Sequence, residues 1–343
     1  MRMVTLSDVA KAAGVSRSAA SKALLGGGGK TTKVSPETVV RIRKAASKLG
    51  YRPNLLAQRL ANKRHDIIGL IVDSQCCYLY SSIMNAIEQL TSQAGFRLQV
   101  GLVHDSYDAI KRYADDFLGY NIQNVICMAH YYGELSYRIP PLFKPFKNPL
   151  FISKPMTDEK FSFVSPDYYN TFCESVEYLF SLNRRKIVFC KTVYKTYDAQ
   201  LRAQALRDMY NKYQLPFQEE QIYCGDVSEC NTPELMKKFL DDVLPLQPDA
   251  LILGCAEATL LAIRELKRRN LRVPEDISII GMESWNGCQA VIPSITVMNN
   301  QPRKIAEAAM QAITNNMKSD SQDIHEIFIK GELIKGESCC LKK

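Results

Sequence analysis

Hydrophobic residues recur at helical spacing along the first 50 positions of the chain and predict three short helices. The first helix is predicted by four apolar residues at i, i+3, i+4 and i+7, which share one face: Leu6, Val9, Ala10 and Ala13. A turn at Gly14 precedes a second helix, in which Ala20 and Leu24 point inward. A cap at Ser35 and a proline after it start a third helix. Its expected buried stripe is Ile42, Ala45, Ala46 and Leu49.

From residue 67 onward the pattern changes, because apolar runs typical of buried strands alternate with amphipathic helices. The run IIGLIV at 67–72 is followed by SSIMNAIEQLTSQAG and then by RLQVGLV at 97–103. A second series of the same kind begins at residue 171. Such βαβ repetition predicts parallel sheets with helices on both faces. The expected fold class is therefore α/β, with an all-α N-terminal part and two lobes.

Polar side chains around the first two helices indicate a helix-turn-helix. Thr5 can cap the first helix, and Asp8 lies three residues later, at capping-box spacing. The outward side of the second helix carries short polar and basic residues: Ser16, Arg17, Ser18, Ser21 and Lys22. The second helix of such a pair enters the DNA major groove. A three-helix bundle without a DNA role is the alternative, and the basic outward face favours DNA binding.

Charge is distributed unevenly along the 343 residues. Residues 1–65 hold fourteen Lys and Arg against two acidic residues, a net charge of +12, whereas the whole chain carries +8. Residues 66–343 therefore carry −4. This uneven charge suits a protein whose N-terminal part lies on phosphates and whose remaining part does not.

Cysteine spacing and hydropathy narrow the class of protein further. The 11 cysteines are scattered without a CxxC pair, and the four histidines fall at no ligand spacing to them, so we expect reduced thiols and no metal site. We also expect no cofactor. We expect no membrane contact, because no apolar run reaches the length of a membrane span. The expected location is the cytoplasm, on the nucleoid.

Three stretches together resemble one known family. They are TLSDVAKAAGVSRSAASKAL from residue 5, SPETVVRIRKAASKLGYRPN from residue 35 and LAQRLA from residue 56. The match resembles the headpiece and hinge of the lac repressor (LacI/GalR) family of bacterial transcriptional regulators. The resemblance implies a DNA-binding headpiece at 1–50, a hinge helix and linker at 51–65, and a two-lobed effector-binding and dimerisation domain at 66–343.

The resemblance assigns DNA contacts residue by residue. Arg17, Ser18 and Lys22 would face base edges, while Ser16, Ser21 and Thr5 would mainly contact phosphates. In the hinge, Asn54 can cap a short helix that in this family folds on DNA. Leu60 matches the leucine that the family inserts between base pairs, with Ala57 beside it. The alternative is that Leu60 is an ordinary linker residue.

The remainder resembles a periplasmic sugar-binding protein, with landmarks such as VPEDISIIGMES at 273–284. In that fold the chain crosses between the lobes three times, which we place near residues 164, 298 and 323. The first lobe would comprise about 66–163 and 299–322, and the second about 164–298 and 323–343. The segment 326–340 would supply the last strand of the second lobe. Ligand would bind between the lobes, at the carboxyl ends of the strands.

The family's ligand positions are only partly retained. Arg202 matches the arginine that clamps the ligand, and Glu283 stands where the family has Asp. The usual Asn-Asp after one strand is Cys255-Ala256 here, and the usual Asn-Pro after the first strand is Cys77-Tyr78. Losing these acceptors disfavours a typical pentose or hexose. Tyr78 could instead stack on a flatter ligand, so the expected effector is carbohydrate-like but atypical.

The sequence therefore predicts a transcriptional regulator, a homodimeric repressor that binds a near-palindromic operator on double-stranded DNA. A small molecule between the lobes would change operator affinity. The alternative is a DNA-binding regulator without such an effector, controlled by a protein partner or by abundance. An enzyme is not expected, because no nucleophile–base pairing, metal spacing or phosphate-binding loop is present.

Overall fold

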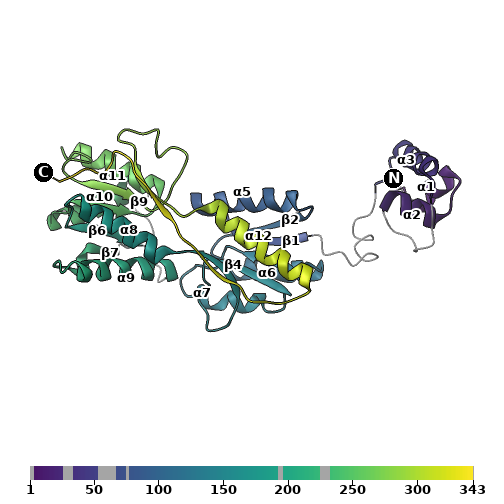
Figure 1. Ribbon diagram of the computed structural model, residues 1–343, viewed down its shortest axis with the longest axis horizontal. Helices are drawn as coiled ribbons and strands as arrows, with labels where there is room; N and C mark the ends of the chain where they lie inside the picture. Colours follow the sequence, from purple (N-terminus) through teal and green to yellow (C-terminus); the bar gives the residue numbers. More distant parts are fainter. Residues whose placement is uncertain are drawn as a thin grey trace. The chain divides into compact units, whose positions relative to one another are not determined.

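The computed structural model describes residues 4–25, 34–52, 67–74, 77–191, 196–224 and 232–342. The chain divides into two compact units, Met1–His65 and Asp66–Lys343, which we call the headpiece and the core domain (Figure 1). The predicted fold class is confirmed: the headpiece is all-α, and the core domain contains two parallel-stranded sheets covered by helices.

The headpiece is a bundle of three helices. They are α1 (Leu6–Ala13), α2 (Arg17–Leu25) and α3 (Pro36–Leu49). Gly14, which has a φ of 62°, ends α1 in the left-handed region that favours glycine. The buried core comprises Val9, Ala10, Ala13, Ala20, Ile42 and Ala46. The expected stripe of α3 was wrong at its end, because Leu49 lies in the last turn and is 38% exposed.

The first lobe of the core domain is built on a six-stranded sheet with the order β11-β5-β4-β3-β1-β2. Its strands are β1 (Ile67–Asp73), β2 (Arg97–Val103), β3 (Asn124–Cys127), β4 (Asn148–Ile152), β5 (Ser162–Pro166) and β11 (Glu326–Ile329). Its helices are α5 (Tyr78–Gln93), α6 (Tyr107–Gly119), α7 (Leu135–Arg138) and α12 (Pro302–Ser319), with a 3-10 turn, η1 (Pro140–Phe143). Every pairing in this sheet is parallel.

The second lobe repeats this architecture with the strand order β12-β10-β9-β8-β6-β7. Its strands are β6 (Ile187–Lys191), β7 (Ile222–Cys224), β8 (Ala250–Leu253), β9 (Ser278–Gly281), β10 (Thr296–Asn299) and β12 (Glu332–Ile334). Its helices are α8 (Tyr168–Ser181), α9 (Tyr197–Lys212), α10 (Pro233–Val243) and α11 (Ala256–Arg268), with 3-10 turns η2 (Glu219–Gln221) and η3 (Leu244–Leu246). Only the edge pair β10–β12 is antiparallel among the described pairings.

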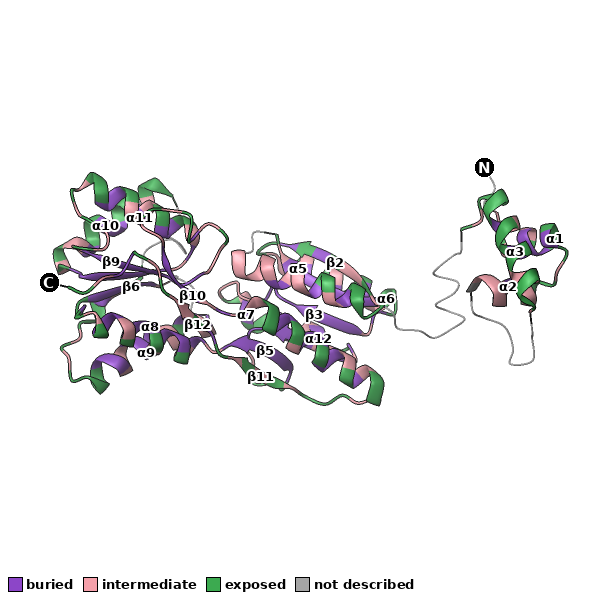
Figure 2. Ribbon diagram, turned by 45° about the horizontal axis from the view of Figure 1, so that its top comes forward, coloured by how far each residue is buried: buried purple, intermediate pink, exposed green. Residues whose placement is uncertain are grey.

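Each sheet buries both of its faces, as the near-continuous apolar strands predict. Alternate residues of β1 show how the faces are divided. Ile68 and Leu70 pack beneath α5 and α12, whereas Ile67 and Ile71 pack beneath α6. In the second lobe, α8 and α9 cover one face, and α10 and α11 cover the other. Figure 2 shows the buried strands between helices that are exposed on their outer sides.

The chain passes between the sheets three times. The first two passages lie between β5 and α8 and between β10 and α12, within a few residues of the expected positions 164 and 298. The third lies at 330–331, because β11 pairs with β5 in the first sheet and only β12 joins the second. Assigning the whole of 326–340 to the second lobe was therefore wrong. Apolar alternation identifies a strand, but it does not identify the strand that it pairs with, because that pairing depends on residues far away in the sequence.

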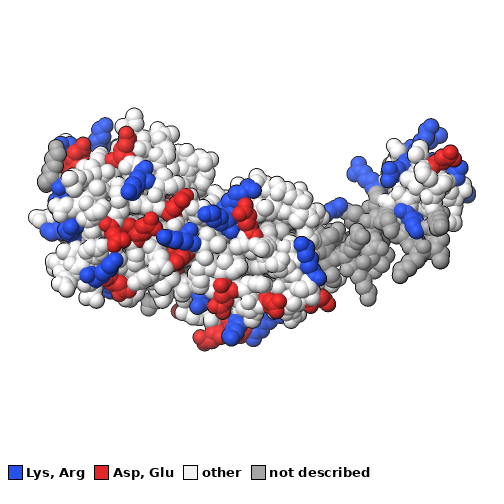
Figure 3. All heavy atoms as spheres, viewed as in Figure 1, with Lys and Arg blue, Asp and Glu red and all other residues white. Residues whose placement is uncertain are grey.

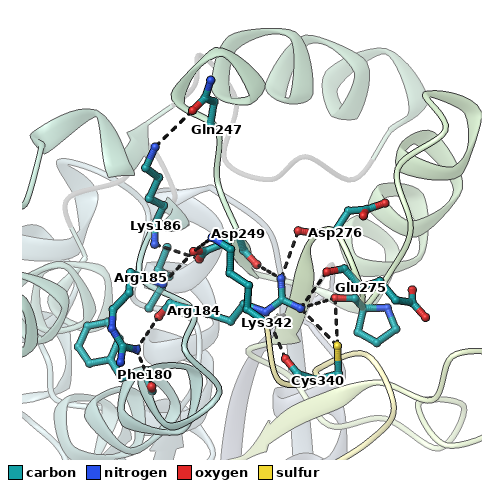
Figure 4. A network of polar contacts seen from close by, with 12 residues as sticks. Phe180, Arg184, Arg185, Lys186, Gln247, Asp249, Glu275, Asp276, Cys340 and Lys342 are labelled. Carbon is teal, nitrogen blue, oxygen red and sulfur yellow. Dashed lines mark hydrogen bonds and ion pairs between the residues drawn. The ribbon is translucent and has the colours of Figure 1, made fainter.

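A buried arginine ties the C-terminal segment to the second lobe (Figure 4). The guanidinium of Arg184 is fully buried and donates to five main-chain carbonyls, those of Asp249, Pro274, Glu275, Asp276 and Cys340, at 2.7–3.3 Å. The neighbouring Asp249 carboxylate accepts from the backbone N–H groups of Arg185 and Lys186, at 2.9 Å each. These bonds join the start of β6, the loop before β9 and the end of the chain.

Candidate functional site

The outward face of α2 is available for contact with a partner. Ser16, Arg17 and Ser18 are exposed, and Ser21 and Lys22 are half-buried. The Ser16 hydroxyl accepts from the backbone N–H of Ala19 at 3.1 Å, so it caps α2. Figure 3 shows Lys and Arg gathered on the visible face of the headpiece. The helix thus presents a short basic and polar surface, and its buried side is held by the headpiece core.

Thr5 has a structural bond that bears on its predicted phosphate contact. Its hydroxyl accepts from the N–H of Asp8 at 3.3 Å, while the Asp8 carboxylate accepts from the Thr5 N–H at 2.8 Å. This confirms the predicted capping box. The Thr5 hydroxyl also donates to Asp8 at 2.7 Å, so in the free headpiece it is already bonded. The hinge residues Asn54, Ala57 and Leu60 lie outside the described residues.

A cavity of about 220 Å³ lies between the two lobes of the core domain. Its walls come from the segments that follow the carboxyl ends of the strands, which is where ligands bind in open α/β sheets. The lining includes two of the three predicted effector residues, Arg202 and Glu283. The other polar lining residues are Tyr80, Tyr131, Tyr168, Thr196, Asp198 and Asn300. The cavity is smaller than most sites for drug-sized ligands.

Arg202 projects from α9 and is already paired. Its guanidinium donates to the carboxylate of Asp198, one helical turn earlier, and both side chains are largely buried. The same guanidinium lies over the ring of Tyr168, 4.5 Å from the ring centroid. The planar guanidinium of Arg202 is therefore held between the carboxylate of Asp198 and the ring face of Tyr168. A ligand that takes hydrogen bonds from Arg202 has to share it with Asp198.

Glu283 follows the end of β9 in the second lobe, yet its carboxylate reaches the first lobe. Its Oε1 accepts from the backbone N–H of Leu79, in the first turn of α5, at 2.7 Å. The residue as a whole is 7% exposed. The predicted acceptor of the cleft is thus bonded to the opposite lobe.

Three phenols line the part of the cavity near the lobe crossing. Tyr80 and Tyr168 both bond the hydroxyl of Ser153, at 3.1 and 2.9 Å, and Tyr131 donates to the carbonyl of Lys154 at 2.5 Å. Burial raises the pKa of Tyr80 and of Tyr131 well above the usual range for tyrosine. These hydroxyls therefore stay protonated and serve as hydrogen-bonding groups.

Two buried polar atoms beside the cleft have no hydrogen-bond partner among the described residues, Nδ1 of His130 and Oγ1 of Thr196. Thr196 lines the cavity and is 6% exposed. His130 lies after β3, and its Nε2 is 2.8 Å from the carbonyl oxygen of Ile152. Burial lowers the pKa of His130 to about 4, so its ring is neutral at physiological pH.

The structure corrects the prediction for Tyr78. It is the first residue of α5, and the cavity is lined instead by Cys77, Leu79 and Tyr80. Successive helical residues point about 100° apart, so Tyr78 and Tyr80 face different sides. Trp285, the only tryptophan of the chain, packs against the cluster of Cys288, Ile295 and Val297.

Sequence reasoning missed Tyr80, Tyr131, Tyr168 and Asp198. Three of them lie a few residues after the ends of β1, β3 and β5, so the rule for the carboxyl ends of parallel strands could have found them. Asp198 lies four residues before Arg202 on α9, a spacing that brings two side chains together. The small Cys255 is buried, and its sulfur accepts from the N–H of Ala258 at 3.4 Å, so it caps α11.

Within the described ranges there is no group of three or more His, Cys, Asp or Glu residues that could hold a metal ion. The nine cysteines that the structure describes are all free. None of the helices in the described part of the chain is long and apolar enough to cross a membrane.

Comparison with known families matches the two units separately. Residues 5–54 match the family described as bacterial regulatory proteins, lacI family. Residues 176–339 match the periplasmic binding protein-like domain.

Curated relatives span almost the whole chain. Catabolite control protein A of Priestia megaterium is 23% identical over 322 residues, covering 93% of this chain and 94% of the relative. The HTH-type transcriptional repressor PurR of Histophilus somni (strain 2336) is 23% identical over 334 residues, covering 97% and 98%. Among solved structures, the lac repressor dimer bound to operator and the anti-inducer ONPF superposes with a TM-score of 0.84 at 20% identity, covering 99% of this chain and 100% of that one.

Proposed function

This chain belongs to the lac repressor (LacI/GalR) family of bacterial regulators, and on that premise we propose that it is a dimeric repressor whose operator affinity changes when a small molecule occupies the inter-lobe cleft. The observation that carries the proposal is the exposed, basic face of α2 on a helix-turn-helix whose two helices are both capped at their N-termini. Arg17, Ser18 and Lys22 would contact base edges. Ser16 and Ser21 would contact phosphates, and Thr5 would do so with the hydroxyl that now bonds Asp8.

The hinge completes the proposed DNA contact. Leu60, with Ala57 beside it and Asn54 as the cap, would insert between base pairs from a short helix that forms on DNA. A DNA partner also implies a cytoplasmic protein located on the nucleoid. The relatives named as repressors support regulation of transcription over catalysis.

An exposed apolar edge supports the dimer. Val100 and Leu102 lie two residues apart on β2, so they share one face of the edge strand. They are 41% and 57% exposed. An exposed apolar edge strand is a surface that proteins usually cover. A second copy related by a two-fold axis would cover it and would explain a near-palindromic operator.

The proposed effector contacts Arg202 and Glu283 and is a small, atypical carbohydrate-like molecule. A regulator without a small-molecule effector, controlled by a protein partner or by abundance, is the second candidate. It is favoured by one observation: both Arg202 and Glu283 are already bonded within the chain. A sugar or nucleobase that raises the melting temperature and changes operator affinity would exclude this second candidate.

Selection of bound sequences from a random DNA pool with the full chain tests the proposal. We expect one near-palindromic motif, and the absence of any enriched motif would refute it. On the enriched operator, Lys22→Ala should weaken binding by about 1–3 kcal/mol while affecting random DNA less. Lys48→Ala, which changes an exposed lysine of α3, is the matched control. Equal losses on operator and random DNA would show that Lys22 touches only phosphate.

A further inference from the structure

The bond from Glu283 to Leu79 joins the two lobes across the cleft, and its acceptor is held rigidly. The residue before it, Met282, donates its N–H to the carbonyl of Leu253 at 2.8 Å. The carbonyl of Met282 accepts from the side-chain amide of Asn300 at 3.4 Å. The backbone that carries Glu283 is thus anchored to β8 and to the segment after β10. Because this backbone is anchored at two points, the Glu283 carboxylate has a fixed position from which to hold the Leu79 N–H.

The donor is a backbone N–H that the helix itself does not satisfy. The amides of the first turn of an α-helix have no intrahelical acceptor. The first such bond in α5 runs from Ser81 to the carbonyl of Cys77, at 3.0 Å. Cys77, the N-cap residue, supplies no side-chain cap. Glu283 therefore performs the capping role from the opposite lobe, where the positive end of the helix dipole also favours a carboxylate.

The length of the side chain matters for this contact. The family resemblance places Asp at this position, and Glu is longer by one methylene, about 1.5 Å. With the backbone anchored, the shorter side chain would leave the carboxylate about 4 Å from the Leu79 nitrogen, which is too far for a hydrogen bond. The contact between the lobes thus depends on a glutamate.

We propose that Glu283 is a clasp of the unliganded protein: its carboxylate holds the first turn of α5 to the second lobe, sets the affinity for DNA, and must be displaced by any effector that takes the Leu79 N–H. This inference rests on the proposed function, because it concerns regulation through the same cleft. Arg202 is also engaged by Asp198, so both predicted effector residues that line the cavity are bonded within the chain. A ligand would then replace the bonds that Glu283 and Arg202 make within the chain by bonds to itself. Because the bond of Glu283 joins the two lobes, ligand binding would be coupled to lobe movement.

Hydrogen exchange at the start of α5 tests the clasp directly in the full chain without ligand. The variants are Glu283→Asp, Glu283→Gln and Glu283→Ala, and the control is Glu257→Asp, the same change at an exposed position of the second lobe. We expect the Leu79 amide to exchange about 10 to 100 times faster in the Asp and Ala variants. The Gln variant keeps the length and one acceptor oxygen, so it should lie between these and the wild type. Equal exchange in all the proteins overturns the clasp.

Operator affinity provides the second measurement, on the sequence selected from the random pool. We expect the dissociation constant of Glu283→Asp to change about fivefold or more, in either direction, while Glu257→Asp matches the wild type. Faster exchange with unchanged affinity overturns the regulatory role. Exchange across β8 and β9 confirms that each variant is folded, and Glu283→Gln serves if the alanine variant is not. A wild type that enriches no DNA motif refutes the proposed function, whereas the exchange result still decides whether the clasp exists.

Discussion

The headpiece and the core domain differ in how their polar side chains are bonded. In the headpiece the bonds are local and exposed, such as those between Thr5 and Asp8 and between Ser35 and Thr38, each three residues apart. The core domain has exposed local bonds too, but it also contains buried or partly buried bonds that join distant segments. Arg184 bonds the carbonyl of Cys340, 156 residues away, and Glu283 bonds Leu79, 204 residues away.

This difference has a functional consequence. Local caps involve few side chains, and Ser16, Arg17 and Ser18 on the outward side of α2 are exposed. In the core domain, the long-range bond of Glu283 to Leu79 and the bond of Arg202 to Asp198 instead engage the groups that would meet a ligand. The headpiece therefore offers a surface that is ready to bind, whereas the cleft must first release its own contacts. Binding to DNA and binding of an effector thus carry different internal costs.

The largest effect is expected from breaking the long-range bonds of Arg184. Arg184→Met would leave buried carbonyls without their donor, at about 1–3 kcal/mol for each that finds no replacement. We expect a loss of about 3 kcal/mol or more in the free energy of unfolding of the core domain. Denaturant unfolding followed by the fluorescence of Trp285, which lies in the same lobe, measures it.

An arginine of the headpiece is the matched control. Arg17 is exposed, so Arg17→Met should change the free energy of unfolding by less than about 0.5 kcal/mol. Because the substitution is the same at both positions, the difference in unfolding free energy between the two variants reflects the burial and the long-range bonds of Arg184. Similar unfolding curves for the two variants would contradict the comparison.

The sequence predicted the headpiece in detail because its determinants are close together along the chain. The capping box of Thr5 and Asp8, the turn at Gly14 and the buried Ala20 all follow from spacings of a few residues. Only Leu49 was misplaced, at a helix end where the burial pattern fades. Strand and helix alternation likewise predicted both sheets of the core domain.

The cleft could be predicted only in part, because its contacts are non-local. Arg202 and Glu283 were placed by resemblance, and both line the cavity. Nothing in the local pattern indicates that Glu283 bonds Leu79, and the choice between Tyr78 and Tyr80 depends on where α5 begins. The partner sheet of β11 escaped prediction for the same reason, since strand pairing joins residues 163 positions apart.

A buried histidine should give an effect of intermediate size. Burial lowers the pKa of His130 to about 4 from an ordinary value of 6.5, and the bond to Ile152 and the charge of Asp198 oppose this only partly. Because the folded pKa is depressed, the unfolded chain takes up the proton first as the pH falls. The stability supplied by the neutral ring is nearly complete at pH 7 and is lost progressively down to about pH 4.

Urea unfolding at pH 7 and pH 5 measures this linkage. Between these values the wild type should lose about 2 kcal/mol more of its unfolding free energy than His130→Gln does. Glutamine can still donate to the carbonyl of Ile152 but does not titrate. Equal pH dependence in the two proteins would show that the depressed pKa of His130 contributes nothing to stability.

The smallest effect is expected from the local bonds of the headpiece. Thr5→Ala removes the hydroxyl that caps α1, which should cost about 1 kcal/mol, because the bond is exposed and water can replace it. Hydrogen exchange of the α1 amides in the full chain measures the change. Ser7→Ala, at an exposed position of the same helix, should stay within about 0.5 kcal/mol of the wild type. A loss for Thr5→Ala as large as that for Arg184→Met would show that distance along the chain and burial do not rank these bonds.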